Sequence, residues 1–306
     1  MNQNLVVTSG EAFVDVDAVA CAIAYAELLQ LEDKKAEVVF PGTLNASITP
    51  SLVSLGLPYL TRPSQSQSKY VVVDVSEPEF FAQFVALDDV VEVYDHHPGF
   101  ESYWAEKIGK NAHIESIGAC ATLIWEEFKK RGKGSFISEK SSHLLMTAIV
   151  SNTLNFGAVI THERDRRSYT ELSQKIKMVD DWIEKYFLEQ EREVIRNPVN
   201  AITSDTKILT FSQLESPVVV GQSEIWNGKK FIETYQNDIS LALDAFRCEQ
   251  SIMNVLSLSE GKSRFYSRNQ TVKDLFSQRL GVKFDGDFGI ASRLWLRKEI
   301  LKQLGR

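Results

Sequence analysis

Two histidines and an aspartate stand side by side at Asp95, His96 and His97, after the β-branched and aromatic run Val90–Tyr94. Such a run predicts a buried strand, and the proline and glycine that follow predict a turn. Open α/β sheets bind their ligands at the carboxyl ends of the strands. Carboxylate and imidazole groups together suit Mn²⁺, Zn²⁺ or Fe. The stretch therefore indicates a metal site, and the alternative is a surface turn that happens to contain two histidines.

Two further stretches end in carboxylates. The apolar run Leu5–Thr8 leads through a glycine-containing loop to Asp15 and Asp17, and the run Tyr70–Val73 leads directly to Asp74. An aspartate at the end of a single strand is commonly a helix N-cap, which is the alternative interpretation here. Three strands that all end in such groups favour a shared site, because parallel strands bring their carboxyl ends to one edge of a sheet.

The elements that must position these side chains alternate in the first half of the chain, as βαβ units do. Strands are expected over 5–8, 36–40, 70–74 and 90–94, with helices over 18–31 and 119–128. From 139 to 188 the pattern is almost wholly helical. Beyond a linker near 197–200 we expect strands over 206–211, 217–221, 253–258 and 264–266, and helices over 231–246, 271–280 and 290–304.

A chain of 306 residues is long for one compact core, so two domains are expected. We predict an α/β fold in which residues 1–190 form an N-terminal domain around a mostly parallel sheet. Residues 191–306 are expected to form a smaller α/β domain that binds substrate. The active site is expected in the cleft between the two domains.

These residues in combination resemble the DHH phosphoesterase superfamily, most closely the branch of family II (manganese-dependent) inorganic pyrophosphatases and prune-type exopolyphosphatases. Asp15 and Asp17 match the first motif, Asp74 the second, and Asp95-His96-His97 is the signature that names the superfamily. The resemblance covers nearly the whole chain. Further matches lie at 118–122, at 151–156 and, more weakly, at 291–293, where Ala-Ser-Arg resembles a Ser-Arg-Lys motif of the C-terminal domain.

The resemblance implies a hydrolase of pyrophosphate or short-chain polyphosphate that uses two divalent ions, Mn²⁺ or Mg²⁺, to activate a bridging water. The implied metal ligands are Asp15, Asp17, Asp74, His96, Glu11 and Asn152, with Asp74 bridging both ions. His97 is expected to face the phosphate, and Asp95 to fix an imidazole or join the ligands. Arg293 and Lys207 are the expected substrate-binding cations.

Three positions depart from the family pattern. Glu11 stands where the pyrophosphatases have a histidine and the exopolyphosphatases an asparagine. Asn152 replaces a ligand aspartate, and Leu294 replaces the lysine of the Ser-Arg-Lys motif. Two alternatives therefore stay open. One is a weakened or inactive relative that binds a phosphorylated ligand or a protein partner. The other is a DHH nuclease or phosphodiesterase, although residues 281–289 lack the glycine cluster of those proteins.

The composition of the chain limits the classes of ligand and partner that it can bind. The formal net charge of −7 disfavours binding along a nucleic-acid backbone, which needs a basic surface. A small anionic phosphate substrate remains compatible, because bound cations reverse the local field. No apolar run is long enough to span a membrane, and no signal peptide is visible, so we expect a cytoplasmic protein without membrane contact. The three cysteines are expected to be free thiols, and a homodimer is left open.

Overall fold

The computed structural model describes residues 4–11 and 13–305. The chain divides into two compact units. Unit 1 comprises residues 1–156 and 160–180, and unit 2 comprises 157–159 and 181–306. The boundary predicted after residue 190 falls inside helix α7 (Trp182–Arg196), and that position stays a prediction.

Unit 1 is built on a five-stranded parallel sheet in the order β3-β1-β5-β6-β7. The strands are β1 (Leu5–Thr8), β3 (Ala36–Val39), β5 (Lys69–Val73), β6 (Val90–Asp95) and β7 (Ala112–Ile114). The central strands are rich in valine because both faces of the sheet are covered, as is usual for parallel sheets. The predicted α/β architecture with a mostly parallel first sheet is confirmed.

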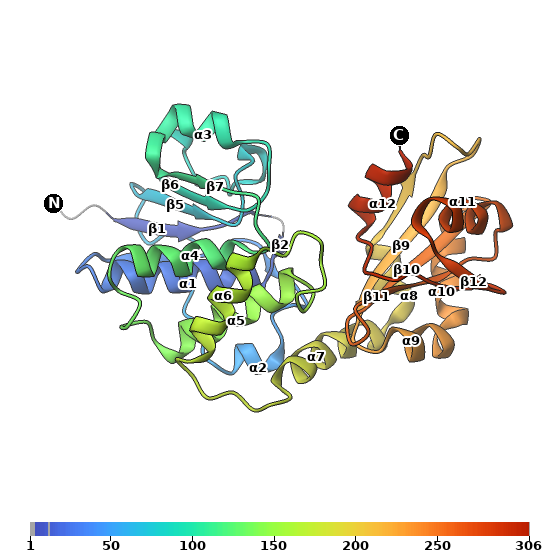
Figure 1. Ribbon diagram of the computed structural model, residues 1–306. Coiled ribbons are helices and arrows are strands. Elements are labelled where there is room, and N and C mark those ends of the chain that lie inside the picture. The colour runs from blue at the N-terminus through green and yellow to red at the C-terminus, as the bar shows by residue number, and fades with distance from the viewer. Residues whose placement is uncertain (1–3, 12, 306) are drawn as a thin grey trace. The chain divides into compact units, whose positions relative to one another are not determined.

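Helices cover both faces of this sheet, with α1 and α4 on one side and α3 on the other (Figure 1). The helices of unit 1 are α1 (Val16–Gln30), α2 (Pro50–Val53), α3 (Glu101–Ile108), α4 (Cys120–Lys130), α5 (Glu139–Asn152) and α6 (Glu163–Ser173). Single 3₁₀ turns lie at Pro78–Phe80, Leu87–Asp89 and Gly109–Asn111. Strands β2 (Phe13–Val14) and β4 (Thr43–Leu44) form a separate two-stranded parallel sheet. Helix α1 is apolar around most of its circumference because it packs on the sheet and also against α5.

Unit 2 has a six-stranded mixed sheet in the order β12-β13-β11-β10-β9-β8. The strands are β8 (Thr206–Leu209), β9 (Val218–Ile225), β10 (Gln250–Ser257), β11 (Lys262–Tyr266), β12 (Lys283–Asp285) and β13 (Phe288–Ile290). Besides α7, the helices are α8 (Pro198–Ser204), α9 (Gly228–Thr234), α10 (Gln236–Asp244), α11 (Gln270–Leu280) and α12 (Arg297–Leu304). Apolar side chains of α11 and α12 cover one face of the sheet, and those of α8, α9 and α10 cover the other.

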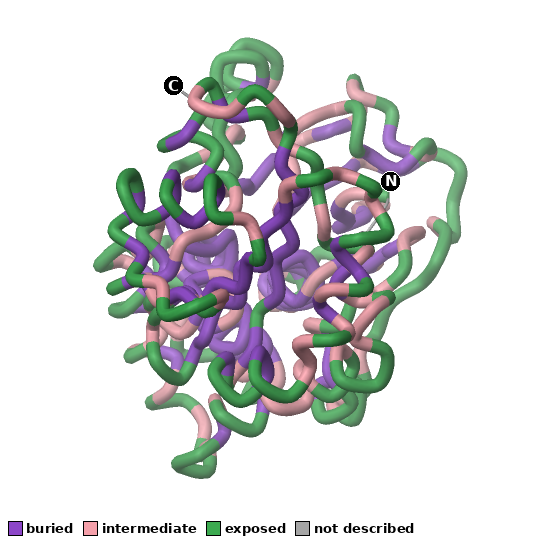
Figure 2. The backbone as a smooth tube through the Cα atoms, turned by 90° about the vertical axis from the view of Figure 1, so that its right-hand side faces the viewer, coloured by how far each residue is buried: buried purple, intermediate pink, exposed green. Residues whose placement is uncertain are grey.

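The buried residues run through the strands and the inner helix faces, whereas the exposed residues gather on loops and outer helix faces (Figure 2). Among the described residues, no helix is both long and apolar enough to cross a membrane.

Two helices predicted for unit 2 are wrong in extent. The predicted helix 231–246 is two helices, because Tyr235 leaves helical geometry with φ −107° and ψ 23°. The predicted helix 290–304 begins only at Arg297. Before it, the chain bonds to strand β11: the Ala291 N–H donates to the Ser263 carbonyl, and the Ser263 N–H to the Arg293 carbonyl. Backbone groups used in this way cannot form an intrahelical ladder.

Candidate metal centre

Strands β5 and β6 end side by side and bring three predicted site residues together. Asp74, His96 and His97 each offer a ligand atom, and these atoms all lie within 4.8 Å of one another. Among the described residues this is the only group of three or more such ligands that the structure forms. Nε2 of His96 lies 3.5 Å from Oδ1 of Asp74, and their side chains are 8% and 7% exposed. Oδ1 of Asp74 is buried and accepts no hydrogen bond.

The backbone at Asp74 is held in a rare conformation, with φ +61°. Its N–H donates to the carbonyl of Tyr94 on the neighbouring strand at 2.8 Å. A non-glycine residue in the left-handed region costs about 1–3 kcal/mol and persists where its surroundings enforce it, often at functional sites. No helix begins at Asp74, so the N-cap interpretation of this residue is wrong.

The ring of His96 is oriented by a backbone carbonyl. Nδ1 of His96 lies 3.1 Å from the carbonyl oxygen of Ile117. A carbonyl only accepts, so Nδ1 carries the proton and Nε2 presents its lone pair beside Asp74. Burial, followed by the charge of His97, lowers the pKa of His96. A neutral imidazole fixed in this tautomer is the form that binds a metal ion.

Asp95 orients His97. Its Oδ1 accepts the backbone N–H groups of His96 and His97 at 2.7 and 3.1 Å and lies 2.8 Å from Nδ1 of the His97 ring. Burial alone would raise the pKa of Asp95, but the hydrogen bond and charge of His97 hold it below its usual range. The Asp95 side chain is fully buried, whereas that of His97 is 59% exposed. Asp95 thus fixes the His97 imidazole, and the catalytic roles of both residues stay predictions.

Asp15 and Asp17 lie at the start of α1, outside the group of three. Asp15 caps the helix, because its Oδ1 accepts the N–H groups of Asp17 and Ala18 at 2.9 and 3.0 Å. Asp17 is fully buried, and its two carboxylate oxygens accept the backbone N–H groups of Cys120 and Ala121, each at 2.8 Å. These contacts use only some of the lone pairs of each carboxylate.

The buried carboxylates around Asp74 carry negative charge that requires a positive charge beside it. Burial, and after it the charge of Asp15, raises the pKa of Asp17 to about 7. Burial and the charges of Asp17 and Asp15 raise the pKa of Asp74 well above its usual range. Buried carboxylates that repel one another, with an orphaned oxygen and a neutral imidazole beside them, are a donor set that fits a divalent cation.

Glu11 and Asn152, the two residues of unit 1 that depart from the family pattern, differ in how far they are buried. Glu11 is exposed in a bend, where its backbone N–H donates to the Phe80 carbonyl at 2.8 Å. Asn152 is the last residue of α5, and its buried Nδ2 has no hydrogen-bond partner. A neutral amide at this position brings no negative charge to the centre.

The predicted substrate cations lie in unit 2. The Arg293 guanidinium stacks on the Trp295 ring, 3.4 Å from its centroid, and donates to the Leu294 carbonyl at 2.6 Å. It also pairs with Glu299 at 3.3 Å. Leu294 is only 1% exposed, so the residue that replaces the family's lysine packs inside the unit. Lys207 is exposed on strand β8.

Three adjacent strands fix the segment that carries Arg293. The Ser263 hydroxyl accepts the Trp295 N–H at 2.9 Å, and the Asn254 amide donates to the Trp295 carbonyl at 2.6 Å. Gln222 accepts the Arg297 N–H at 2.7 Å. This support was not predicted from the sequence, although polar residues within apolar strand patterns are a signal for such buried contacts.

Comparison with known proteins shows that the chain is similar to manganese-dependent inorganic pyrophosphatases. No family model matches the sequence. A protein of Deinococcus radiodurans assigned as a manganese-dependent inorganic pyrophosphatase is 23% identical over 95% of this chain and 94% of its own length. The manganese-dependent inorganic pyrophosphatase of Methanothrix thermoacetophila is 24% identical over 95% of this chain and 94% of its own length.

Solved structures share the fold. A Methanococcus jannaschii protein assigned to the family II inorganic pyrophosphatases aligns with a TM-score of 0.64 at 19% identity, covering 99% of this chain and 98% of that one. An exopolyphosphatase-related protein of Bacteroides fragilis aligns with a TM-score of 0.55 at 14% identity, covering 98% and 90%. The predicted resemblance to the DHH phosphoesterases, in their branch of family II pyrophosphatases and exopolyphosphatase-related proteins, is therefore confirmed.

Proposed function

We propose that this protein is a divalent-metal-dependent hydrolase of phosphoanhydride bonds that acts on pyrophosphate or short-chain polyphosphate. The observation that carries the proposal is the group formed by Asp74, His96 and His97 at the ends of β5 and β6. The manganese dependence and pyrophosphatase assignment of relatives that align over nearly the whole chain support it.

We assign Asp15, Asp17, Asp74 and His96 as the residues that would hold two Mn²⁺ ions, with Glu11 and Asn152 completing the set. Bound in such a pair, the ions neutralise charge on phosphate oxygens and lower the pKa of water to a value useful near neutral pH. The chain itself pre-orients the donors. His96 is locked by the Ile117 carbonyl, and Asp74 is held by its bond to Tyr94.

His97 is the residue we assign to the substrate phosphate. Asp95 holds its Nδ1, so the ring keeps a fixed orientation while most of its surface stays exposed. A buried carboxylate behind an imidazole stabilises the imidazolium form, which donates a hydrogen bond to a phosphate oxygen or a proton to a leaving group. Arg293 and Lys207 are the residues that we assign to the remaining negative charge of the substrate.

The test is phosphate release by metal-stripped protein supplied with Mn²⁺, Mg²⁺ or no metal, on pyrophosphate, tripolyphosphate, long polyphosphate and ATP. We expect release from pyrophosphate or tripolyphosphate that requires a divalent ion and is lost in His97→Ala. Absence of release from every substrate, in protein that binds Mn²⁺, would reject the enzyme and favour a binding protein. The neutral Asn152 and the buried Leu294 are the observations that favour that second function.

A further inference from the structure

A buried segment that runs from the loop after β7 into the first turn of α4 contacts two of the assigned metal ligands. We call Ile117–Thr122 the 117–122 segment, and its residues are buried throughout. At its start, the Ile117 carbonyl accepts from Nδ1 of His96. Near its end, the N–H groups of Cys120 and Ala121 bind the carboxylate of Asp17. A shift of this segment would therefore turn His96 and Asp17 together.

One carboxylate outside the centre holds the segment in place. Asp165, in the first turn of α6, is fully buried. Its Oδ2 accepts the N–H of Gly118 at 3.0 Å, and its Oδ1 accepts the hydroxyl of Thr122 at 2.6 Å. The same carboxylate accepts the N–H of His162 at 2.7 Å, which ties it to the start of its own helix.

The fit around Gly118 shows how close this approach is. A Cβ atom at Gly118 would lie 2.4 Å from Oδ2 of Asp165 and 2.7 Å from the Thr153 side chain. Any side chain there would push Asp165 away from the segment. The glycine is therefore required by the close approach of the carboxylate, since its φ is not in the left-handed region.

We propose that Asp165 is a positioning residue for the metal centre, which fixes the 117–122 segment and through it orients His96 and Asp17. The inference rests on the proposed function, because it requires that these two residues hold a divalent cation. In the described structure Asp165 forms no hydrogen bond or ion pair with an assigned ligand; it acts through Gly118 and Thr122.

The contacts of Asp165 call for a side chain that offers acceptors only. Three donors converge on Asp165, and a carboxylate is acceptor-only with lone pairs for all of them. An asparagine would direct its NH₂ group at one of these donors, so Asp165→Asn should displace the segment without changing side-chain size. Thr122→Val removes one donor with almost no change of shape, and Thr122→Ser restores the hydroxyl.

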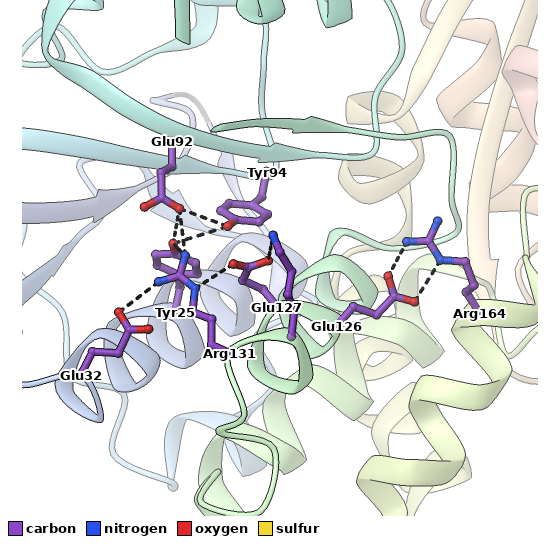
Figure 3. Close-up of polar contacts among 9 residues, drawn as sticks. Tyr25, Glu32, Glu92, Tyr94, Glu126, Glu127, Arg131 and Arg164 are labelled. Carbon is purple, nitrogen blue, oxygen red and sulfur yellow. Dashed lines mark hydrogen bonds and ion pairs between the residues drawn. The ribbon is translucent and has the colours of Figure 1, made fainter. Parts of the chain in front are cut away.

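Arg164 provides a matched control because it joins the same two helices by another route. Its guanidinium pairs with Glu126 of α4 (Figure 3). It also pairs with Glu115, and both partners lie outside the 117–122 segment. Arg164→Gln removes these ion pairs and leaves the contacts of Asp165 with Gly118 and Thr122 in place. This control therefore distinguishes a weaker connection between α4 and α6 from a change in the orientation of His96 and Asp17.

The experiment measures Mn²⁺ affinity by calorimetry in metal-stripped full-length protein, together with the thermal unfolding midpoint in EDTA. We expect Asp165→Asn and Thr122→Val to weaken Mn²⁺ binding about 10- to 100-fold, the usual effect of losing an outer partner of a metal ligand. Thr122→Ser should restore the affinity, and Arg164→Gln should keep it while lowering the midpoint. In EDTA, nitrogen NMR of His96 should show Nδ1–H protonation in the wild type and a mixture of tautomers in Thr122→Val.

Unchanged Mn²⁺ affinity in folded Thr122→Val, with lowered midpoints alone, would overturn the inference and leave Asp165 a purely structural residue. If Asp165→Asn fails to fold, Thr122→Val and its control Thr122→Ser still test the positioning role of Asp165. Failure of the proposed function is distinguishable. Wild type that binds Mn²⁺ but hydrolyses nothing rejects the enzyme and leaves the positioning role intact, whereas wild type that binds no divalent ion rejects both.

Discussion

Two groups of buried or half-buried carboxylates share the same helices of unit 1 but differ in how their charge is balanced. The proposed metal centre includes Asp17 near the start of α1, whose carboxylate accepts the N–H groups at the start of α4. The second group, which we call the Arg131 cluster, lies at the other end of α4, where Arg131 is the C-cap residue. It comprises Tyr25, Glu32, Glu92, Tyr94, Glu127 and Arg131 (Figure 3).

The Arg131 cluster contains its own cation. The guanidinium pairs with Glu127 at 2.7 Å, Glu92 at 3.1 Å and Glu32 at 3.2 Å, and it donates to the Tyr25 hydroxyl at 2.6 Å. Burial would raise the pKa values of Glu127 and Glu32, but their basic partners lower both. The cluster is thus satisfied by the chain alone, as a structural site is.

The metal centre lacks such a cation. The pKa values of Asp17 and Asp74 are raised, because burial and mutual repulsion are not offset by any neighbouring arginine or lysine contact that the described residues provide. The comparison teaches that buried carboxylates mark a functional site when their compensating charge is missing, and a structural one when it is built in.

Asp74→Asn should produce the largest effect. The amide keeps the shape and tolerates the left-handed backbone, but it removes the charge on which both ions depend. We expect phosphate release to fall at least about 1,000-fold, the upper range for losing one electrostatic partner at a reaction centre. Chemical denaturation in EDTA should show a metal-free protein at least as stable as wild type, because a repelling buried charge is gone. Retained turnover would contradict the comparison.

Arg131→Met should have the opposite effect: the protein should lose stability and keep its activity. Removing the shared guanidinium from this largely buried group leaves Glu92 without a basic partner, whereas Glu127 and Glu32 keep only Lys130 and Lys34. We expect a cost of about 3 kcal/mol in the free energy of unfolding. Urea denaturation measures this loss, which we expect to be the same with and without Mn²⁺. Turnover of the folded variant well below its unfolding midpoint should be unchanged. An activity defect larger than the change in folded fraction would show that the cluster is more than structural.

Asn152→Asp sharpens the contrast, because it adds a carboxylate to the centre that has no cation of its own. We expect tighter Mn²⁺ binding and about tenfold faster release from pyrophosphate or tripolyphosphate, which requires only ~1.4 kcal/mol of transition-state stabilisation. Calorimetry and steady-state kinetics provide the two readouts. If neither affinity nor rate changes, Asn152 does not face the bound ions.

The smallest effect concerns pH. Glu127 has a folded pKa below its usual value of 4.5, so its pairing with Arg131 stabilises the protein above that pH and is lost as pH falls through the lowered pKa. Unfolding free energies in EDTA at pH 5.5 and pH 3.5 should therefore differ more in wild type than in Glu127→Gln. An identical pH dependence in the two proteins would remove Glu127 from the balanced cluster.

The sequence was sufficient for the parallel sheet and for the group at Asp74, His96 and His97, because strand periodicity and strand-end position determine which side chains meet. The sequence was insufficient to predict side chains whose roles depend on partners far away along the chain. Nothing in the local sequence around Arg131 indicates that it joins α4 to Glu32 and Glu92. Asp165 was missed because its partners lie more than 40 residues earlier in the chain.

The segment before α12 shows the same limit in unit 2. Its apolar spacing is typical of a helix, yet bonds to β11 hold residues 291–296 in non-helical structure and place Arg293 on Trp295. Five short strands, β2, β4, β7, β12 and β13, were not predicted, since runs of two or three residues carry little periodicity.

The most direct test of the account is a calorimetric titration of Mn²⁺ into metal-stripped wild-type protein, with Asp74→Asn and Arg131→Met measured alongside. The account predicts that wild type binds two Mn²⁺ ions per chain and that Arg131→Met does the same with unchanged affinity. Asp74→Asn should lose at least one ion. Binding that is absent in wild type, or that survives Asp74→Asn undiminished, would contradict the claim that these uncompensated carboxylates form a metal centre.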